Sequence, residues 1–132
     1  MTLMSGKCLL DTNIVIGIFS GDEAVMTELA KAREIFIPST VMGELYYGAQ
    51  KSAHKKKNTA IIDQFASVNT ILACDVETAR QYGKIKESLR VKGRPIPEND
   101  IWIAAMAFQH EMPLVTRDQH FSEIKGLVIK TW

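Results

Sequence analysis

Two aspartates each follow a short apolar run that is typical of a buried strand. Asp11 comes directly after residues 7–10 (KCLL), and Asp118 comes directly after residues 114–117 (LVTR). In parallel sheets, ligands bind outside the carboxyl ends of the strands, so both side chains are placed for chemistry. Each could instead cap the helical segment that follows it, and capping leaves carboxylate lone pairs free for a second role.

Asp100 gives the most informative of the acidic signals. It stands at the start of eight consecutive apolar residues, 101–108 (IWIAAMAF), within a stretch of helical spacing. A helix that is apolar on every side is a buried helix, and Asp100 lies on its inward stripe. The helix dipole favours a negative group by about 0.3 to 1 kcal/mol, which is less than burial of the charge costs. Asp100 therefore needs a partner, either a cation or the nearby Arg94.

Glu44 lies inside a predicted helix, past the first turn that begins at Ser39. Its neighbours three and four residues away are small or partly apolar rather than charged, although solvent exposure is an equal alternative. Two uncharged side chains, Asn13 and Thr116, flank the predicted strand ends and could hydrogen-bond a carboxylate or a bound water.

The chemistry follows if these four carboxylates meet at one edge of the sheet. Each pair of like charges about 5 Å apart repels by roughly 3 kcal/mol at an effective dielectric near 20. Several such pairs rival the stability of a typical domain, about 5 to 15 kcal/mol, so protons or metal ions must neutralise the cluster. Ligands that are all oxygen favour Mg²⁺ or Mn²⁺ over zinc. Such an ion suits an in-line phosphoryl displacement, so we expect phosphodiester hydrolysis.

The elements that must position these side chains alternate between strand and helix. Short apolar runs predict strands at 7–10, 35–37, 70–74, 114–116 and 127–129, and helical spacing predicts helices at 13–19, 24–33, 39–49, 55–68, 76–90 and 98–111. Alternation of this kind predicts a parallel sheet with helices on both faces and strands buried on both faces. The loop at residues 92–97, which holds two prolines, joins elements of one domain.

Composition places few limits on function. The chain has 132 residues, is 46% hydrophobic, and carries a net charge of +1, which predicts one globular domain without a global electrostatic signature. The first ten residues fit neither a signal peptide nor a membrane span, so we expect a cytoplasmic protein with no membrane contact. Cys8 and Cys74 lie in apolar runs without metal-binding spacing, and we expect both to be buried, reduced thiols.

Basic residues form two clusters that could contact a polyanion. The first covers residues 51–57 and the second covers residues 84–94. A solvated helix face explains the first cluster equally well. The second cluster leads into the loop before Asp100, so Lys92 and Arg94 are the preferred candidates for contacts with such a polyanionic substrate.

Four segments in this order resemble the PIN-domain family, and specifically the VapC-type toxin ribonucleases of bacterial and archaeal toxin–antitoxin pairs. These segments are residues 9–13 (LLDTN), 38–45 (PSTVMGEL), 96–105 (IPENDIWIAA) and 114–121 (LVTRDQHF). The resemblance covers nearly the whole chain. It implies a single PIN domain over residues 1–132, folded as a three-layer α/β/α sandwich with a central parallel sheet of about five strands.

The same resemblance implies function. It predicts RNA cleavage that depends on Mg²⁺ or Mn²⁺, with Asp11 and Asp100 as direct metal ligands, Glu44 as a ligand or as the residue that orients metal-bound water, and Asp118 completing the acidic site. It also implies a homodimer and a cognate VapB-type antitoxin that lays a segment over the acidic groove.

A hydrophobic surface for that antitoxin is one interpretation of four apolar side chains at helical spacing; ordinary core packing is the other. They are Met26, Leu29, Tyr46 and Tyr47.

Two other classes of protein remain as alternatives. A PIN-fold module could bind RNA or a protein partner without cleaving RNA. A phosphoacceptor receiver domain would share the size, the alternation and an aspartate beside Mg²⁺. However, that domain needs an acidic pair near the first strand and a lysine after the last, whereas residues 11–13 hold one carboxylate and Asp118 stands where the cation is needed. No short motif identifies the RNA, because RNA is often recognised by shape.

Overall fold

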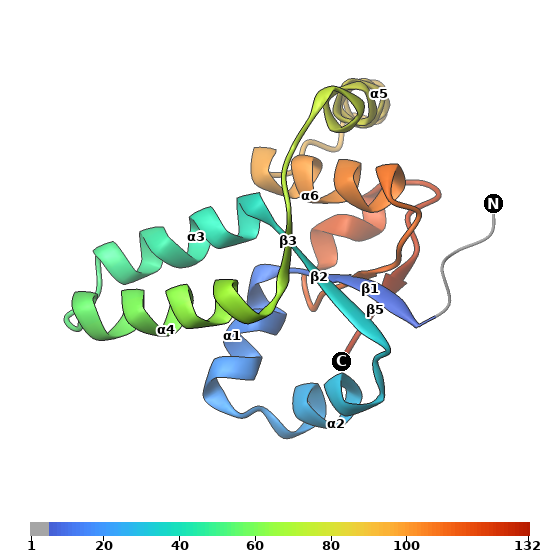
Figure 1. Ribbon diagram of the computed structural model, residues 1–132. Coiled ribbons are helices and arrows are strands. Elements are labelled where there is room, and N and C mark those ends of the chain that lie inside the picture. Colours follow the sequence, from blue (N-terminus) through green and yellow to red (C-terminus); the bar gives the residue numbers. More distant parts are fainter. Residues whose placement is uncertain (1–5) are drawn as a thin grey trace.

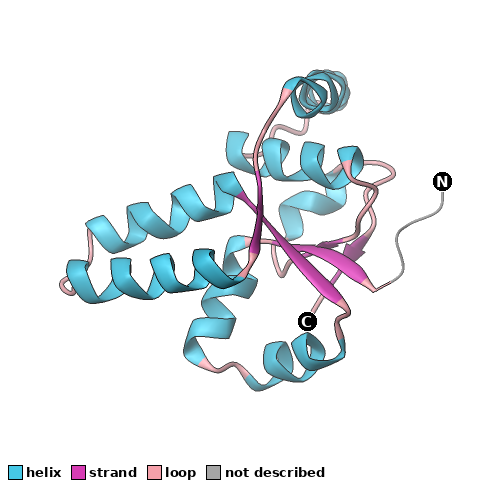
Figure 2. Ribbon diagram, viewed as in Figure 1, coloured by secondary structure: helices cyan, strands magenta, loops and turns pink. Residues whose placement is uncertain are grey.

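Five parallel strands form the centre of the computed structural model, which describes residues 6–132 (Figures 1 and 2). The strands are β1 (Lys7–Leu10), β2 (Glu34–Pro38), β3 (Thr70–Leu72), β4 (Leu114–Val115) and β5 (Ile129–Lys130). They lie in the order β3-β2-β1-β4-β5, and each neighbouring pair is parallel. The chain moves outward from β1 in one direction and then returns to its other side, so the strand order reverses between β1 and β4.

The helices form layers on either side of this sheet. They are α1 (Thr12–Ser20), α2 (Glu23–Lys31), α3 (Ser39–Gln50), α4 (Lys55–Val68), α5 (Val76–Lys92) and α6 (Glu98–Gln109), followed by a short 3₁₀ helix, η1 (Gln119–Glu123). Figure 1 shows α5 and α6 on one side of the sheet, α1 and α2 on the opposite side, and α3 and α4 extending outward as an antiparallel pair. The predicted α/β/α architecture with a five-stranded parallel sheet is confirmed.

Local sequence explains where several helices begin and end. The side chain of Asp11 caps α1, and that of Asp75 caps α5. Both helices end at a glycine in the left-handed conformation, Gly21 and Gly93, which a residue with a Cβ atom adopts only at a cost. The last predicted helix is shorter than expected, because Glu111 takes a positive φ of 52° and α6 ends at Gln109.

α6 is the buried helix that the apolar segment predicts. It lies between the sheet and α5 in Figure 1, so it has protein on two sides. Ile103, Ala104 and Met106 are fully buried, and Asp100 in its first turn is only 9% exposed. The first turn of this buried helix therefore places the Asp100 carboxylate at the edge of the sheet.

Burial of every strand on both faces was also predicted, and it is wrong for the two edges of the sheet. The central strands β1, β2 and β4 are mostly buried, whereas β3 and β5 are half-buried or exposed. An edge strand has only one neighbouring strand, and its outer side faces solvent.

The cysteine prediction is confirmed for Cys8 and wrong for Cys74. Cys8 lies in β1 and is buried, but Cys74 is exposed, because β3 ends at Leu72 and the chain leaves the sheet before α5. Within residues 6–132, no helix has both the length and the apolar composition needed to cross a membrane.

Candidate active site

Strand pairing brings the first two site residues together. Leu10 of β1 lies opposite Val115 of β4, so the residues that follow, Asp11 and Thr116, emerge side by side where the strand order reverses. The Thr116 hydroxyl donates to Asp11 Oδ2 at 2.7 Å, and the Asp11 backbone N–H donates to the Val115 carbonyl at 3.0 Å. The site thus starts at the switch point where open α/β sheets bind ligands.

Asp11 combines the two roles that its position in the sequence suggests. Its Oδ1 accepts a hydrogen bond from the backbone N–H of Thr12 at 2.8 Å, which caps α1, and its Oδ2 faces Thr116. Asp11 is 5% exposed. Burial raises its pKa, the bonds from Thr116 and Thr12 lower it, and the nearby charge of Asp118 raises it further.

The Thr116 hydroxyl connects Asp11 to Asp118. The same oxygen that donates to Asp11 accepts a hydrogen bond from the backbone N–H of Asp118 at 3.0 Å, and Thr116 is 1% exposed. Asn13 supports the site from the other side: its amide lies 3.5 Å from Asp11 Oδ2, and its carbonyl oxygen accepts from the Arg117 backbone N–H at 3.3 Å. Asn13 and Thr116, the two uncharged residues expected beside the carboxylates, therefore both lie next to Asp11.

Asp100 reaches the same place from the first turn of α6. Its pKa is raised from an ordinary 3.8 to about 6, first by burial and then by the negative charges of Asp11 and Asp118, with His120 opposing the shift. His120 Nδ1 lies 3.4 Å from Asp100 Oδ2 and 3.0 Å from Asp118 Oδ1. Three predicted carboxylates thus come from β1, α6 and the end of β4 to one edge of the sheet.

Glu44, on α3, is the fourth carboxylate and is half-buried. Burial raises its pKa, and the charges of Asp11 and Asp118 raise it further, whereas the nearby side chains of Thr12 and Asn99 lower it. The Thr12 hydroxyl itself is buried and has no hydrogen-bond partner of normal geometry among residues 6–132. Glu44 therefore belongs to the same electrostatic cluster.

Lysine and arginine do not neutralise this cluster. Among the ion pairs of the described chain, none joins any of the four carboxylates to a lysine or arginine. Arg94, the alternative partner for Asp100, is exposed. In the part of the chain that the structure describes, His120 alone approaches the cluster with a group that can become cationic.

His120 is the site residue that sequence reasoning missed. One ligand atom each from Asp100, Asp118 and His120 lies within 4.8 Å of the others, so these three residues could hold a metal ion. Asp11 and Glu44 are not members of this close set. The signal in the sequence was that His120 lies only two residues after Asp118. In the structure Asp118 caps η1 by accepting a hydrogen bond from the His120 backbone N–H at 2.9 Å, and this turn brings the imidazole back toward the end of β4.

The basic residues proposed for RNA binding are differently placed. Lys92 donates to the Glu123 carbonyl at 2.7 Å and lies 3.8 Å from its carboxylate. Lys86 and Arg90 of the same cluster also pair with glutamates. By contrast, no ion pair of residues 6–132 involves the cluster at 51–57, so the preference for Lys92 gains no support and stays a prediction.

An apolar cavity of about 470 Å³ adjoins the acidic site between α1 and the α3–α4 pair. Ile16, Phe19 and Ile61 line it, and it reaches Thr12 and Glu44 at one end. The four apolar residues suggested for partner docking are not among its lining residues, which are Thr12, Ile16, Phe19, Ser20, Glu44, Leu45, Gly48, Ala49, Lys57, Asn58, Ile61 and Ile62.

Comparison with protein families gives one match that spans most of the chain. The PIN domain model matches residues 8–127. "Ribonuclease VapC2" of Haemophilus influenzae is 36% identical over 129 residues, covering 96% of this chain and 98% of the relative. "tRNA(fMet)-specific endonuclease VapC" of Shigella flexneri is 33% identical over 129 residues, with the same coverage of 96% and 98%.

Solved structures give the same picture. VapBC2 from Rickettsia felis, bound to a DNA fragment from its promoter, contains a chain with a TM-score of 0.87 and 32% identity, covering 96% of this chain and 98% of that one. DNA-bound VapBC from Salmonella typhimurium contains a chain with a TM-score of 0.88 and 30% identity, covering 99% of both. Fold and sequence therefore agree over the whole domain.

Proposed function

The chain belongs to the PIN-domain family, and from that membership and its acidic site we propose that it is a divalent-metal-dependent endoribonuclease, the toxin of a toxin–antitoxin pair. One observation carries the proposal. Asp11, Asp100 and Asp118 converge where the strand order reverses, close enough for the charge of Asp118 to raise the pKa values of Asp11 and Asp100, and no described lysine or arginine pairs with them.

The residues present fit a bound Mg²⁺ or Mn²⁺. We assign Asp11 and Asp100 as direct ligands and Asp118 as part of the same acidic site, and we add His120 because its Nδ1 lies beside two of the carboxylates. The imidazole nitrogen favours Mn²⁺ over Mg²⁺, since Mg²⁺ takes oxygen ligands. When bound, the ion supplies activation of water and compensates negative charge on the phosphoryl oxygens.

The protein's own residues orient the reactants. Thr116 fixes Asp11 through its hydroxyl and Asp118 through the backbone, so two carboxylates keep one relative position. Glu44, half-buried and with a raised pKa, would accept a hydrogen bond from the attacking water and orient it. This arrangement needs no protein nucleophile.

The relatives suggest partners and a first substrate. Because the similar solved chains are from VapBC complexes, we propose a VapB-type antitoxin that covers the acidic site and the adjoining apolar cavity. A homodimer and a cytoplasmic location complete the proposal. The name of the Shigella flexneri relative makes initiator transfer RNA the first substrate to test.

A cleavage assay tests the function. Purified protein with Mn²⁺ should cut initiator transfer RNA or another component of total cellular RNA, and EDTA should stop the reaction. Asp11→Asn and Asp100→Asn should abolish cleavage. Glu111→Gln should not, because Glu111 is an exposed carboxylate just beyond the opposite end of α6.

Two results would contradict the proposal in different ways. Cleavage that survives both aspartate substitutions would show that the acidic site is not the active site. Binding of RNA without cleavage of any RNA tested would favour a PIN-fold binding module.

A further inference from the structure

The turn between α3 and α4 concentrates positive charge more than any other segment of this chain. Residues 45–62 include no Asp or Glu, and the net charge of the whole chain is only +1, so the rest of the chain is net acidic. The basic side chains are exposed, and none takes part in an ion pair of the described residues. We call residues 51–57 the lysine turn; its basic members are Lys51, His54, Lys55, Lys56 and Lys57.

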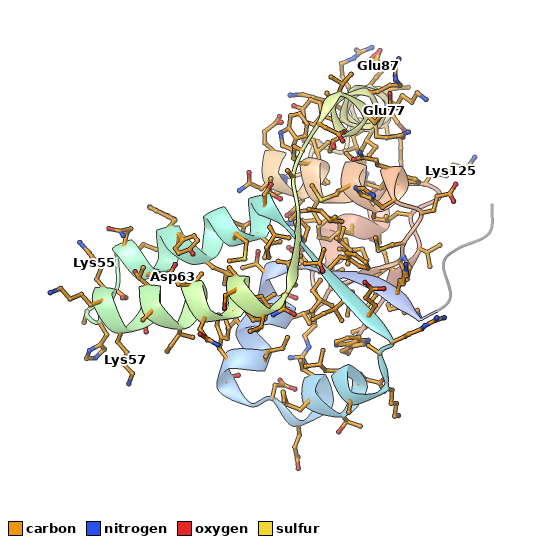
Figure 3. The ribbon with its side chains drawn as sticks, viewed as in Figure 1. Lys55, Lys57, Asp63, Glu77, Glu87 and Lys125 are labelled. Atoms are coloured by element: carbon orange, nitrogen blue, oxygen red, sulfur yellow. The ribbon has the colours of Figure 1, made fainter. Side chains whose placement is uncertain are left out.

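Hydrogen bonds hold the backbone of the lysine turn in one shape. The Ser52 hydroxyl donates to the Ala49 carbonyl at 2.8 Å, and the Asn58 side-chain amide donates to the Ser52 hydroxyl oxygen at 3.0 Å. The Asn58 backbone N–H closes the first turn of α4 on the His54 carbonyl at 2.9 Å. Figure 3 shows Lys55 and Lys57 at the outer end of the α3–α4 pair, pointing away from the rest of the molecule.

Fold stability does not explain this concentration of charge. α4 begins at Lys55, its first turn holds no acidic residue, and His54 makes no capping hydrogen bond with its side chain. Positive side chains at the positive end of a helix dipole are unfavourable, and an uncapped helix start is unfavourable as well. A negatively charged ligand would reverse both effects.

The position of the lysine turn relates it to the acidic site. The same α3–α4 pair carries Glu44, and the cavity that reaches Glu44 and Thr12 also reaches Lys57 and Asn58 at its other end. A substrate strand that leaves the acidic site along α3 would therefore arrive at the lysines.

An exposed aromatic ring lies beside Lys51, one of these cations. Tyr47 is 66% exposed, and Lys51 Nζ lies 4.7 Å from the centre of its ring. Exposed aromatic faces next to cationic side chains bind single-stranded nucleic acid, because bases stack on the ring while phosphates pair with the cations. An acidic protein segment would use the lysines but would have no base to place on Tyr47.

We propose that the lysine turn and Tyr47 form a second RNA-binding site, which holds the phosphates and one base of an unpaired or looped segment of the substrate. The inference rests on the proposed ribonuclease function. It adds a second place on the protein that binds the substrate, at a distance from the bond that is cleaved. The site sets the affinity for RNA, and the acidic site performs the reaction.

Binding measured at several salt concentrations tests the proposal. The probe is a fluorescein-labelled 20-nucleotide single-stranded RNA, with EDTA present to prevent cleavage. The test variant, Lys51→Gln/Lys55→Gln/Lys56→Gln/Lys57→Gln, should lose at least tenfold in affinity at 0.1 M salt. Its plot of log affinity against log salt should flatten by about 3, since each lysine–phosphate contact contributes about 0.7 for a single strand.

Two further variants control for net charge and for the fold. The first removes four exposed basic side chains from outside both basic clusters and should change affinity less than twofold; it is Lys31→Gln/Arg80→Gln/Lys125→Gln/Lys130→Gln. The second replaces the four lysines of the lysine turn by arginine and should retain wild-type binding. The test variant should melt no lower than wild type, because neutralising the first turn of α4 removes an unfavourable charge–dipole interaction.

A third variant separates RNA from an acidic protein partner. Tyr47→Ala should weaken binding of the RNA probe several-fold and leave binding of labelled poly-glutamate unchanged. If poly-glutamate binds the lysine turn as tightly as RNA and Tyr47→Ala changes neither, the site takes an acidic protein and the RNA assignment is wrong.

The remaining outcomes distinguish this inference from the proposed function. If wild type cleaves RNA but the test variant and its charge-matched control have equal affinities and salt dependences, the second site is wrong and the ribonuclease assignment stands. If wild type cleaves nothing while the test variant shows the expected loss, the lysine turn binds RNA and the ribonuclease assignment is wrong. With an active enzyme, the test variant should raise KM and leave kcat unchanged.

Discussion

Neutralising Asp100 should stabilise the fold while destroying the function proposed for it. Asp100 is 9% exposed, and its pKa is raised to about 6 by burial and by the charges of Asp11 and Asp118. Asn has nearly the same shape as Asp and carries no charge. Asp100→Asn should therefore remove repulsion from the folded state in the absence of divalent ions.

The size of the effect follows from the difference between the ordinary pKa of 3.8 and the value of about 6 in the folded protein. This difference corresponds to about 3 kcal/mol between the charged and protonated forms. Loss of the contact with His120 offsets part of it, so we expect about 1 to 3 kcal/mol at pH 7.5. For a domain of this size, that is roughly 3 to 15 °C in Tm.

The effect depends on pH in a definite direction. In the unfolded chain Asp100 ionises near pH 3.8, whereas in the folded chain it keeps its proton until pH is near 6. Between these values the folded state holds a proton that the unfolded state has lost, so wild type loses stability as pH rises. Asp100→Asn and wild type should therefore unfold alike below about pH 3.8, diverge up to about pH 6, and stay apart above it.

Urea unfolding followed by circular dichroism, in EDTA and at several pH values, measures the difference. Glu111→Gln is the matched control, since it removes an exposed carboxylate close to the other end of α6. Mn²⁺ at a hundred times its Kd should stabilise wild type by about 2.7 kcal/mol and Asp100→Asn far less. If Asp100→Asn is no more stable than wild type at pH 7.5, the carboxylates do not repel one another as argued. If Mn²⁺ stabilises the variant as much as wild type, a bound ion does not neutralise this repulsion through Asp100.

Other substitutions test single contacts. Thr116→Val should cost about 1 to 3 kcal/mol in urea unfolding and reduce cleavage, because it removes the hydroxyl that binds Asp11 and leaves the partly buried backbone N–H of Asp118 unpaired, whereas Thr116→Ser should retain both properties. His120→Ala should weaken Mn²⁺ binding on the order of tenfold in calorimetry with little change in Tm, since the side chain is 54% exposed. Gly17→Ala should lower unfolding stability by about 1 to 3 kcal/mol, because the new Cβ atom would lie 2.9 Å from Val25 Cγ2.

Much of the fold could be predicted because it depends on local patterns. The predicted bounds of β1 and α4 match the structure, since an apolar run and a helical spacing are complete within a few residues. Asp11, Asp100 and Asp118 could be found for the same reason: each stands directly beside such a pattern. The position of Asp100 at the start of a mostly buried helix was the most informative, because burial there shields a carboxylate from water.

What could not be predicted depends on contacts between distant segments. Lys92 became less attractive as an RNA contact because Glu123, 31 residues away, accepts its hydrogen bond. Cys74 looked buried because its neighbours are apolar, but β3 is an edge strand that ends two residues earlier. The ligand role proposed for His120 depends on its contact with Asp100, which comes from α6. Sequence neighbours carry no information on the contacts of Lys92 with Glu123 or of His120 with Asp100, nor on the exposure of Cys74.

The two charged surfaces can be understood together as departures from the most stable choice at each position. A sequence selected for stability alone would have an uncharged residue at position 100 and an acidic N-cap residue before Lys55. This chain has such a cap at α5, where Asp75 is the N-cap residue, but not at α4. Instead, negative charge collects where the strands end and positive charge collects at the lysine turn, while the net charge stays at +1. Each surface is unfavourable alone and favourable with a ligand of opposite sign, a cation in one case and phosphates in the other. The proposed metal-dependent nuclease would need both ligands, and the two sites proposed for them would lie along one helix pair and the adjoining sheet edge.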